Sequence, residues 1–203
     1  MIQKIFGSPV ILLTTSNIDK IFSIKTYDKV IECLMHPDNK FIDHPFVRGG
    51  KICTTDLNSN MKLDKIEGLN VLFEFLKKTA LPYVPLFLDK PIQDLKFFNS
   101  WVNLSFQGCE IKNHTDSNEE ADQTKKSLII SFYPKAPLGG ANLVFIHGSK
   151  GDEWASDCSE KDMVEITVEE GNIIIFDNQT LHAVNAHKVN VNRMCIIVEF
   201  TME

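Results

Sequence analysis

The segment "WVNLSFQG" (101–108) decides the fold, because apolar and polar residues alternate along it. Val102, Leu104 and Phe106 would share one face of a strand, and the residues between them the other. Further apolar segments follow at short spacing, with turn residues between them: "SLIISFY" (127–133), "ANLVFIH" (141–147), "MVEITVEEG" (163–171), "NIIIFDN" (172–178), "TLHAVNAH" (180–187) and "RMCIIVEF" (193–200). The pattern predicts about seven or eight strands in an all-β sandwich or small barrel.

The N-terminal part of the chain has a mixed character. "PVILLTT" (9–15) predicts a short buried strand, and "TYDKVIECLMH" (26–36) a weakly amphipathic helix. "FIDHPFVRGGKICTTDLNS" (41–59) resembles a loop with a turn at its two glycines. This half of the chain therefore carries helices as well as strands.

The clearest helix is expected to begin near Asp64 and to end before Pro82. Apolar residues at helical spacing predict that one face packs on a sheet: Leu69, Leu72, Phe73, Leu76 and Ala80. We expect a single domain, mainly β with N-terminal helices (α+β), in which residues 1–95 support a β core of residues 96–203.

Composition excludes several classes of protein. The chain has 203 residues, a net charge of −6 and no long basic run, so nucleic-acid binding is unlikely. No apolar run approaches the roughly 18 to 20 residues of a membrane helix. The five cysteines are scattered and form no CxxC pair, which favours reduced thiols and a cytoplasmic location. No glycine loop of the phosphate-binding kind occurs, which disfavours a nucleotide-binding parallel sheet.

A candidate metal site lies in "IKNHTDSNEE" (111–120). On an extended strand His114 and Asp116 would point to the same side, and His182 in "TLHAVNAH" could supply a third ligand. Two histidines and one carboxylate form the facial triad that binds Fe(II) and leaves positions open. The HxD pair alone is a weak signal, since it occurs by chance in many sequences and a polar surface turn is its default interpretation.

Arg193 strengthens the interpretation, because it opens the otherwise apolar strand "RMCIIVEF" and needs a partner there. A small carboxylate ligand would suit the planar guanidinium.

The order of several motifs carries a family resemblance. "HTD" (114–116) is followed by "LGGANLVF" (138–145), "EEGNIIIFDNQTLHAV" (169–184) and "NR" (192–193). This order resembles the Fe(II)/2-oxoglutarate-dependent dioxygenases, nearest to prolyl hydroxylases and uncharacterised bacterial and phage oxygenases. In the latter group a W-x-N followed by glycine precedes HxD, as it does here. The resemblance covers residues 97–203.

The resemblance implies a double-stranded β-helix, which is a distorted, cupin-like jelly roll. It implies Fe(II) held by His114, Asp116 and His182, with 2-oxoglutarate and O2 as cosubstrates. The implied reaction is hydroxylation of a C–H bond in a peptidyl proline or small metabolite, with release of succinate and CO2.

The resemblance also implies residues that bind 2-oxoglutarate. Its distal carboxylate would lie on Arg193, and Tyr133 matches the position of a tyrosine that contacts the cosubstrate. Asn103 or Ser131 would share that role. The loops at 117–126 and 148–162 depart from the family pattern, so the substrate is not carried over.

Two other functions remain open from the residues alone. One is a non-oxidative, cupin-like jelly roll that binds metal or sugar, and the other is a hydrolase or isomerase using the same metal face. A buried Arg193 would discriminate against the first of these. We further expect His187 to lie on the surface and Trp154 to contact substrate, and the oligomeric state stays open, a homodimer included.

Overall fold

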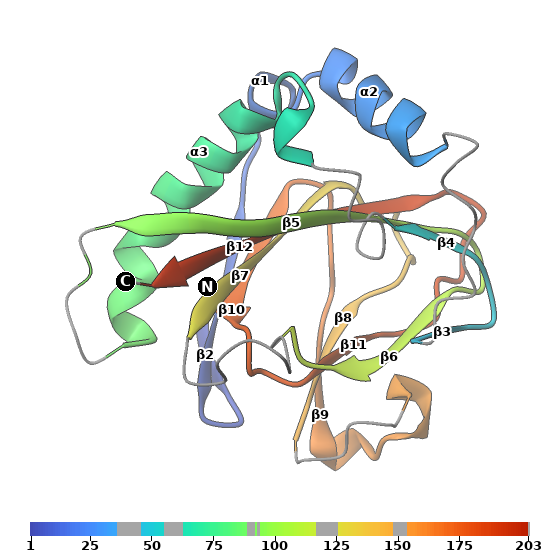
Figure 1. The fold of residues 1–203 in the computed structure, drawn as a ribbon. Coiled ribbons are helices and arrows are strands. Elements are labelled where there is room, and N and C mark those ends of the chain that lie inside the picture. The colour runs from blue at the N-terminus through green and yellow to red at the C-terminus, as the bar shows by residue number, and fades with distance from the viewer. Residues whose placement is uncertain are drawn as a thin grey trace.

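The protein is built on two antiparallel β-sheets with helices on one side (Figure 1). The computed structural model describes residues 1–35, 46–54, 63–88, 92, 94–116, 126–147 and 154–202. The seven-stranded sheet contains, in spatial order, β1 (Ile2–Ile5), β2 (Ser8–Thr14), β10 (Asn172–Asp177), β7 (Ser127–Lys135), β12 (Arg193–Met202), β5 (Leu95–Ser105) and β4 (Ile52–Thr54). The five-stranded sheet contains β3 (Val47–Arg48), β6 (Glu110–His114), β11 (His182–Val184), β8 (Leu143–Ile146) and β9 (Met163–Ile166).

The connectivity is that of a jelly roll. From β5 onward the chain passes back and forth between the two sheets, and only β8 and β9 are consecutive strands in one sheet. The sheets face each other, and the alternate residues that they turn inward form a continuous apolar core. The predicted double-stranded β-helix behind N-terminal helices is therefore confirmed, whereas the functional division at residue 95 stays a prediction.

Helices cover the outer face of the seven-stranded sheet (Figure 1). They are α1 (Ile18–Ile21), α2 (Ile24–Leu34) and α3 (Leu69–Ala80), with 3₁₀ turns η1 (Leu63–Lys65) and η2 (Leu81–Leu86) beside α3. The Ser23 hydroxyl caps α2 by accepting the Thr26 amide hydrogen. Within the described residues, no helix has both the length and the apolar character needed to span a bilayer.

The predicted apolar stripe of α3 is buried as expected, but the start of the helix was misplaced. The helix begins at Leu69 rather than near Asp64, because Gly68 has a φ of 97° and interrupts the helical path. Pro82 ends α3, yet the chain continues as a 3₁₀ turn, in which a proline at the first turn is tolerated.

The segment 41–59 contains two strands where a loop was predicted, although residues 41–45 and 55–59 lie outside the described part of the chain. Strands β3 and β4 are too short for a periodic signal, and they form by pairing with β6 and β5. The Gly49-Gly50 turn joins them across the two sheets. A Cβ atom on Gly50 would lie 2.2 Å from the Cys109 amide nitrogen, so the close approach to the β5–β6 turn requires glycine.

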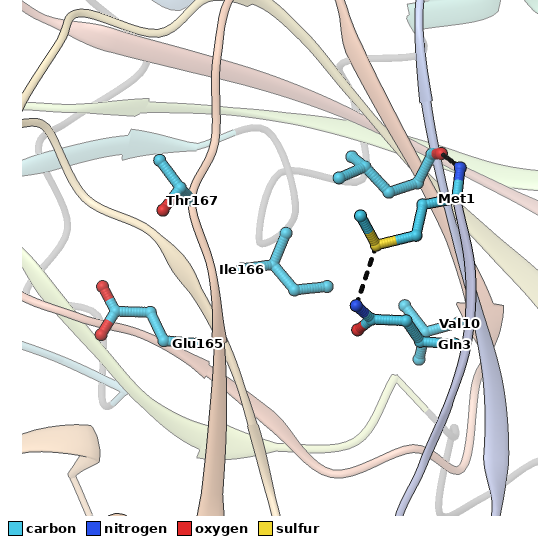
Figure 2. A pocket seen from close by; sticks show the side chains of 7 residues that line it. Met1, Gln3, Val10, Glu165, Ile166 and Thr167 are labelled. Atoms are coloured by element: carbon cyan, nitrogen blue, oxygen red, sulfur yellow. Dashed lines mark hydrogen bonds between the residues drawn. The ribbon is translucent and has the colours of Figure 1, made fainter.

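A hollow of about 210 Å³ lies at the other edge of the sheets, between the β1–β2 hairpin and β9 (Figure 2). Its lining consists of Met1, Gln3, Val10, Leu12, Glu165, Ile166 and Thr167. None of the predicted site residues lines this hollow, so it is separate from the candidate site.

His187 is fully buried, which contradicts the predicted surface position. The prediction failed because β11 ends at Val184, and the period of a strand does not apply beyond it. The His187 ring accepts a hydrogen bond from the Ala141 amide (3.1 Å) and donates one to the Val191 carbonyl (2.7 Å). One imidazole thus joins the turn before β8 to the turn before β12.

We expect His187→Ala to lower the free energy of unfolding by about 2 to 4 kcal/mol, because the buried Ala141 amide loses its partner and a fully buried side chain is removed from its packed site. Chemical denaturation measures this change. The exposed His147, replaced by alanine, is the control and should change stability by less than about 0.5 kcal/mol. Equal effects of the two substitutions would contradict the assigned role of His187.

Candidate metal centre

Three metal-ligating side chains converge at one end of the jelly roll. His114 and His182 are direct cross-strand neighbours in the pairing of β6 with β11. Asp116 follows the end of β6, and one ligand atom from each of the three residues lies within 4.8 Å of the others. Residues 68 positions apart thus meet because two short strands pair in one register.

The histidine rings are oriented by the main chain. The Nδ1 atoms donate to carbonyl oxygens two residues earlier, that of Lys112 for His114 (2.9 Å) and that of Thr180 for His182 (3.0 Å). The Nε2 atoms therefore point toward Asp116, at 3.7 Å from His114 and 3.6 Å from His182. A fixed Nδ1–H leaves the Nε2 lone pair for a metal, the arrangement that protein metal sites favour.

The turn before β11 explains the position of His182. Asp177 accepts hydrogen bonds from the Gln179 amide (3.0 Å) and the Thr180 hydroxyl (2.9 Å), which closes a tight turn after β10. Asp177 therefore acts as a turn residue that positions the start of β11.

Aromatic rings enclose the two histidines. Phe176 packs its edge on the His182 ring at 4.9 Å between centroids, and Phe46 stacks over His114 at 5.9 Å. Burial lowers the pKa of His182 to about 4, and its bond to the Thr180 carbonyl opposes that change. His182 is therefore neutral at physiological pH, as a metal ligand must be.

Arg193 begins β12, pairs with Ser105 at the end of β5 and is buried. It is 1% exposed, its guanidinium carbon lies 4.8 Å from the centre of the Tyr133 ring, and its Nε has no hydrogen-bond partner. Within the described ranges no carboxylate forms an ion pair with it. A buried cation held only by an aromatic face is a site prepared for an anion.

Tyr133 and Ser131 line the same interior face of β7, and both are buried. Burial raises the pKa of the Tyr133 hydroxyl, with a further increase from Cys195 and a decrease from Arg193 and Ser131. Asn103 is half-buried on β5, where it is the cross-strand neighbour of Cys195. The four residues predicted to bind cosubstrate thus line or border one interior region, and their roles stay predictions.

Trp154 lies against Arg48, whose guanidinium carbon is 4.3 Å from the ring centre. Arg48 also forms salt bridges with Glu110 of β6 (2.9 Å) and with Asp157 of η3 (Ala155–Asp157; 3.2 Å), and so it links η3 to β6. A second 3₁₀ turn, η4 (Glu160–Asp162), follows η3 in the chain. A substrate contact by Trp154 stays a prediction. Of the two loops that depart from the family pattern, 117–126 and 148–162, residues 117–125 and 148–153 lie outside the described part of the chain.

Glu199 is a buried polar residue that the sequence interpretation overlooked. It is 6% exposed on β12 and accepts a short hydrogen bond from the Ser127 hydroxyl. Burial, together with the charge of Asp116, raises its pKa to about 7, and the Ser127 bond opposes this. A glutamate inside the apolar run of residues 193–200 was the available signal.

The raised pKa of Glu199 predicts a pH effect on stability. Its carboxyl is more easily protonated in the folded than in the unfolded protein, so its contribution is complete below about pH 4.5 and is lost as the pH rises through about 7. We compare the free energy of unfolding of Glu199→Gln with that of the unsubstituted protein. As the pH is raised from 5 to 8, this difference should shift in favour of the variant by up to about 3 kcal/mol. Denaturation of metal-free protein at both pH values measures this difference, and a pH-independent difference would contradict it.

The fold matches solved structures of oxygenases. The chain aligns over 96% of its length with a prolyl-4-hydroxylase from Pseudomonas putida (13% identity, 92% of that chain, TM-score 0.54). It aligns over 95% of its length with a prolyl hydroxylase from Trichoplax adhaerens solved with a hypoxia-inducible-factor peptide (12% identity, 83% of that chain, TM-score 0.58). It also aligns over 95% of its length with SnoK, an alpha-ketoglutarate-dependent carbocyclase of nogalamycin biosynthesis (12% identity, 79% of that chain, TM-score 0.63).

Sequence comparison alone does not reach these proteins: no protein-family model and no curated protein matches the chain. At such low identity the structural likeness establishes the fold and not the activity. The chain therefore has the fold of the 2-oxoglutarate/Fe(II) oxygenases, a double-stranded β-helix.

Proposed function

We propose that the protein is an Fe(II)- and 2-oxoglutarate-dependent oxygenase that hydroxylates a C–H bond of its substrate. The observation that carries this proposal is the pairing of two features in one roll. A His-Asp-His group converges at one end, and a buried arginine without an anionic partner lies in the interior behind it. The fold shared with known oxygenases supports the same assignment.

The residues fit the groups that the proposal requires. His114, Asp116 and His182 offer the two-nitrogen, one-oxygen donor set suited to Fe(II), and both rings present Nε2. Arg193 offers a guanidinium to the distal carboxylate of 2-oxoglutarate. A cupin-like protein that only binds metal has no use for this buried cation, so Arg193 favours the oxygenase.

In the proposed reaction one oxygen atom of O2 enters the substrate as a hydroxyl, and the other enters the carboxylate of succinate as 2-oxoglutarate loses CO2. Bound Fe(II) supplies this redox chemistry. The chain supplies positioning: carbonyl groups fix the two imidazoles, and Arg193 orients the cosubstrate along the interior. The apolar residues between the sheets exclude water from the reacting groups.

An anaerobic titration tests the proposal. Fe(II) and 2-oxoglutarate added together should give the weak visible charge-transfer band of the chelate, and admission of O2 should then produce succinate. His114→Ala should abolish both signals. Absence of both from the unsubstituted protein, or their persistence in the variant, would refute the assignment.

The substrate class and location extend this proposal. A peptide or small molecule is the proposed substrate, in keeping with the peptide bound to the Trichoplax hydroxylase. A cytoplasmic location is supported by Cys33, Cys109, Cys158 and Cys195, which are free thiols.

A further inference from the structure

Glu199 faces the interior of the roll although the proposed reaction does not use it. Its cross-strand partner Ile129 and its neighbour Ile197 both belong to the core between the sheets, and residues paired in this way share a face. The side chain therefore lies on the same face of β12 as Arg193, six residues and roughly 20 Å along the strand. The two charged residues of this face stand at opposite ends of the core between the sheets.

The carboxylate of Glu199 is only half satisfied. The Ser127 hydroxyl donates to Oε1, and Ser127 is itself held by two hydrogen bonds to Asn178. Over the ranges that the structure describes, no cation pairs with Glu199 and Oε2 accepts no hydrogen bond. A carboxylate that is 94% buried normally has a charged partner or several donors, so this oxygen is suited to a ligand.

Glu199 lies at the end of the roll that holds the three metal ligands. Ser127 begins β7 and is hydrogen-bonded to Asn178, which lies in the turn that leads from β10 to His182. Asn99, the partner of Glu199 on β5, is exposed, so the interior face reaches solvent here. A substrate approaching the metal centre from this side would pass the free oxygen.

Charge balance indicates what that oxygen binds. In the proposed loaded site the two positive charges of Fe(II) and that of Arg193 offset Asp116 and the two carboxylates of 2-oxoglutarate. Glu199 is then the one carboxyl of this set without an opposite charge, and in its buried position it either holds a proton or pairs with a cation. A protonated nitrogen on the substrate would supply the missing charge and donate to Oε2.

We propose that Glu199 binds a protonated amine of the substrate beside the metal centre, so that the oxygenase acts on cationic molecules. This inference rests on the proposed function and names its substrate class. It makes Glu199 a specificity-determining residue, separate from the metal ligands and from the cosubstrate site.

The test compares two small probes of equal length, n-butylammonium and 1-butanol. Their dissociation constants are measured by saturation-transfer NMR on the full chain loaded with Zn(II) and 2-oxoglutarate, which does not turn over. We expect the unsubstituted protein to bind the ammonium probe at least about tenfold more tightly than the alcohol, and Glu199→Gln to lose this preference. Equal binding by the unsubstituted protein, or a preference that survives in Glu199→Gln, overturns the proposal.

A further variant separates recognition by Glu199 from a general effect of protein charge. Glu170→Gln removes an exposed charge from the β9–β10 turn and should keep the ammonium preference. Loss of the preference in this variant would contradict a specific role for the Glu199 charge.

The outcome is distinguishable from failure of the proposed function. The charge-transfer band with Fe(II) and 2-oxoglutarate needs no substrate and should be unchanged in Glu199→Gln. A protein that shows this band but no ammonium preference remains an oxygenase and loses only the proposed substrate class.

Discussion

Asp116→Ala is expected to lower the affinity for Fe(II) by more than about 100-fold and to abolish succinate formation. The carboxylate is the only anionic group of the His-Asp-His cluster, and it lies 3.6 to 3.7 Å from both Nε2 atoms. Loss of groups that only support metal ligands costs about 10- to 100-fold in affinity, so loss of a ligand should cost more. Metal titration by calorimetry measures the first effect and a coupled succinate assay the second.

Asp162→Ala provides the matched control for this experiment. Asp162 is exposed in η4, outside the metal centre. Its loss should leave both metal affinity and succinate formation unchanged. Retention of tight Fe(II) binding by Asp116→Ala would show that the cluster is not the metal site.

Arg193→Met is expected to weaken 2-oxoglutarate binding by about 2 to 5 kcal/mol while Fe(II) binding persists. The same substitution should not lower the stability of the free protein, because it replaces an uncompensated buried charge with an apolar side chain of similar size. Calorimetric titration with 2-oxoglutarate and chemical denaturation measure the two quantities. Unaltered cosubstrate affinity would exclude Arg193 from the binding site.

Arg48→Met should behave in the opposite way. Arg48 is paired with the buried carboxylate of Glu110, so its removal leaves that charge without its partner. We expect a loss of stability with no change in 2-oxoglutarate affinity. The two arginines together separate a structural cation from one that binds a ligand.

The β core was predictable because its strands are long enough to show alternation or continuous apolar runs. The interior positions of Trp101 and Tyr133 and the buried stripe of α3 follow from such periods. Strands β1, β3 and β4 were not predicted. They span two to four residues, and their pairing partners rather than their own composition hold them in place.

Within the candidate site, sequence order picked out the three side chains that converge and the buried Arg193, but it did not pick out Glu199. Arg193 opens its strand, where a charge stands out, whereas Glu199 lies near the C-terminus and resembles an ordinary polar residue at a strand end. Its burial depends on pairing with both β5 and β7. His187 was misjudged for a related reason, since its environment is made by turns that are remote in sequence.

The pairing of His114 with His182 would make a bound metal a crosslink between β6 and β11. These strands are short, and their register is interrupted between His182 and Val184. An ion that binds both histidines binds only the paired arrangement and therefore stabilises it. This stabilisation grows with the logarithm of the metal concentration once that concentration exceeds the dissociation constant. Iron availability would thereby set the rigidity of the five-stranded sheet as well as the capacity for chemistry.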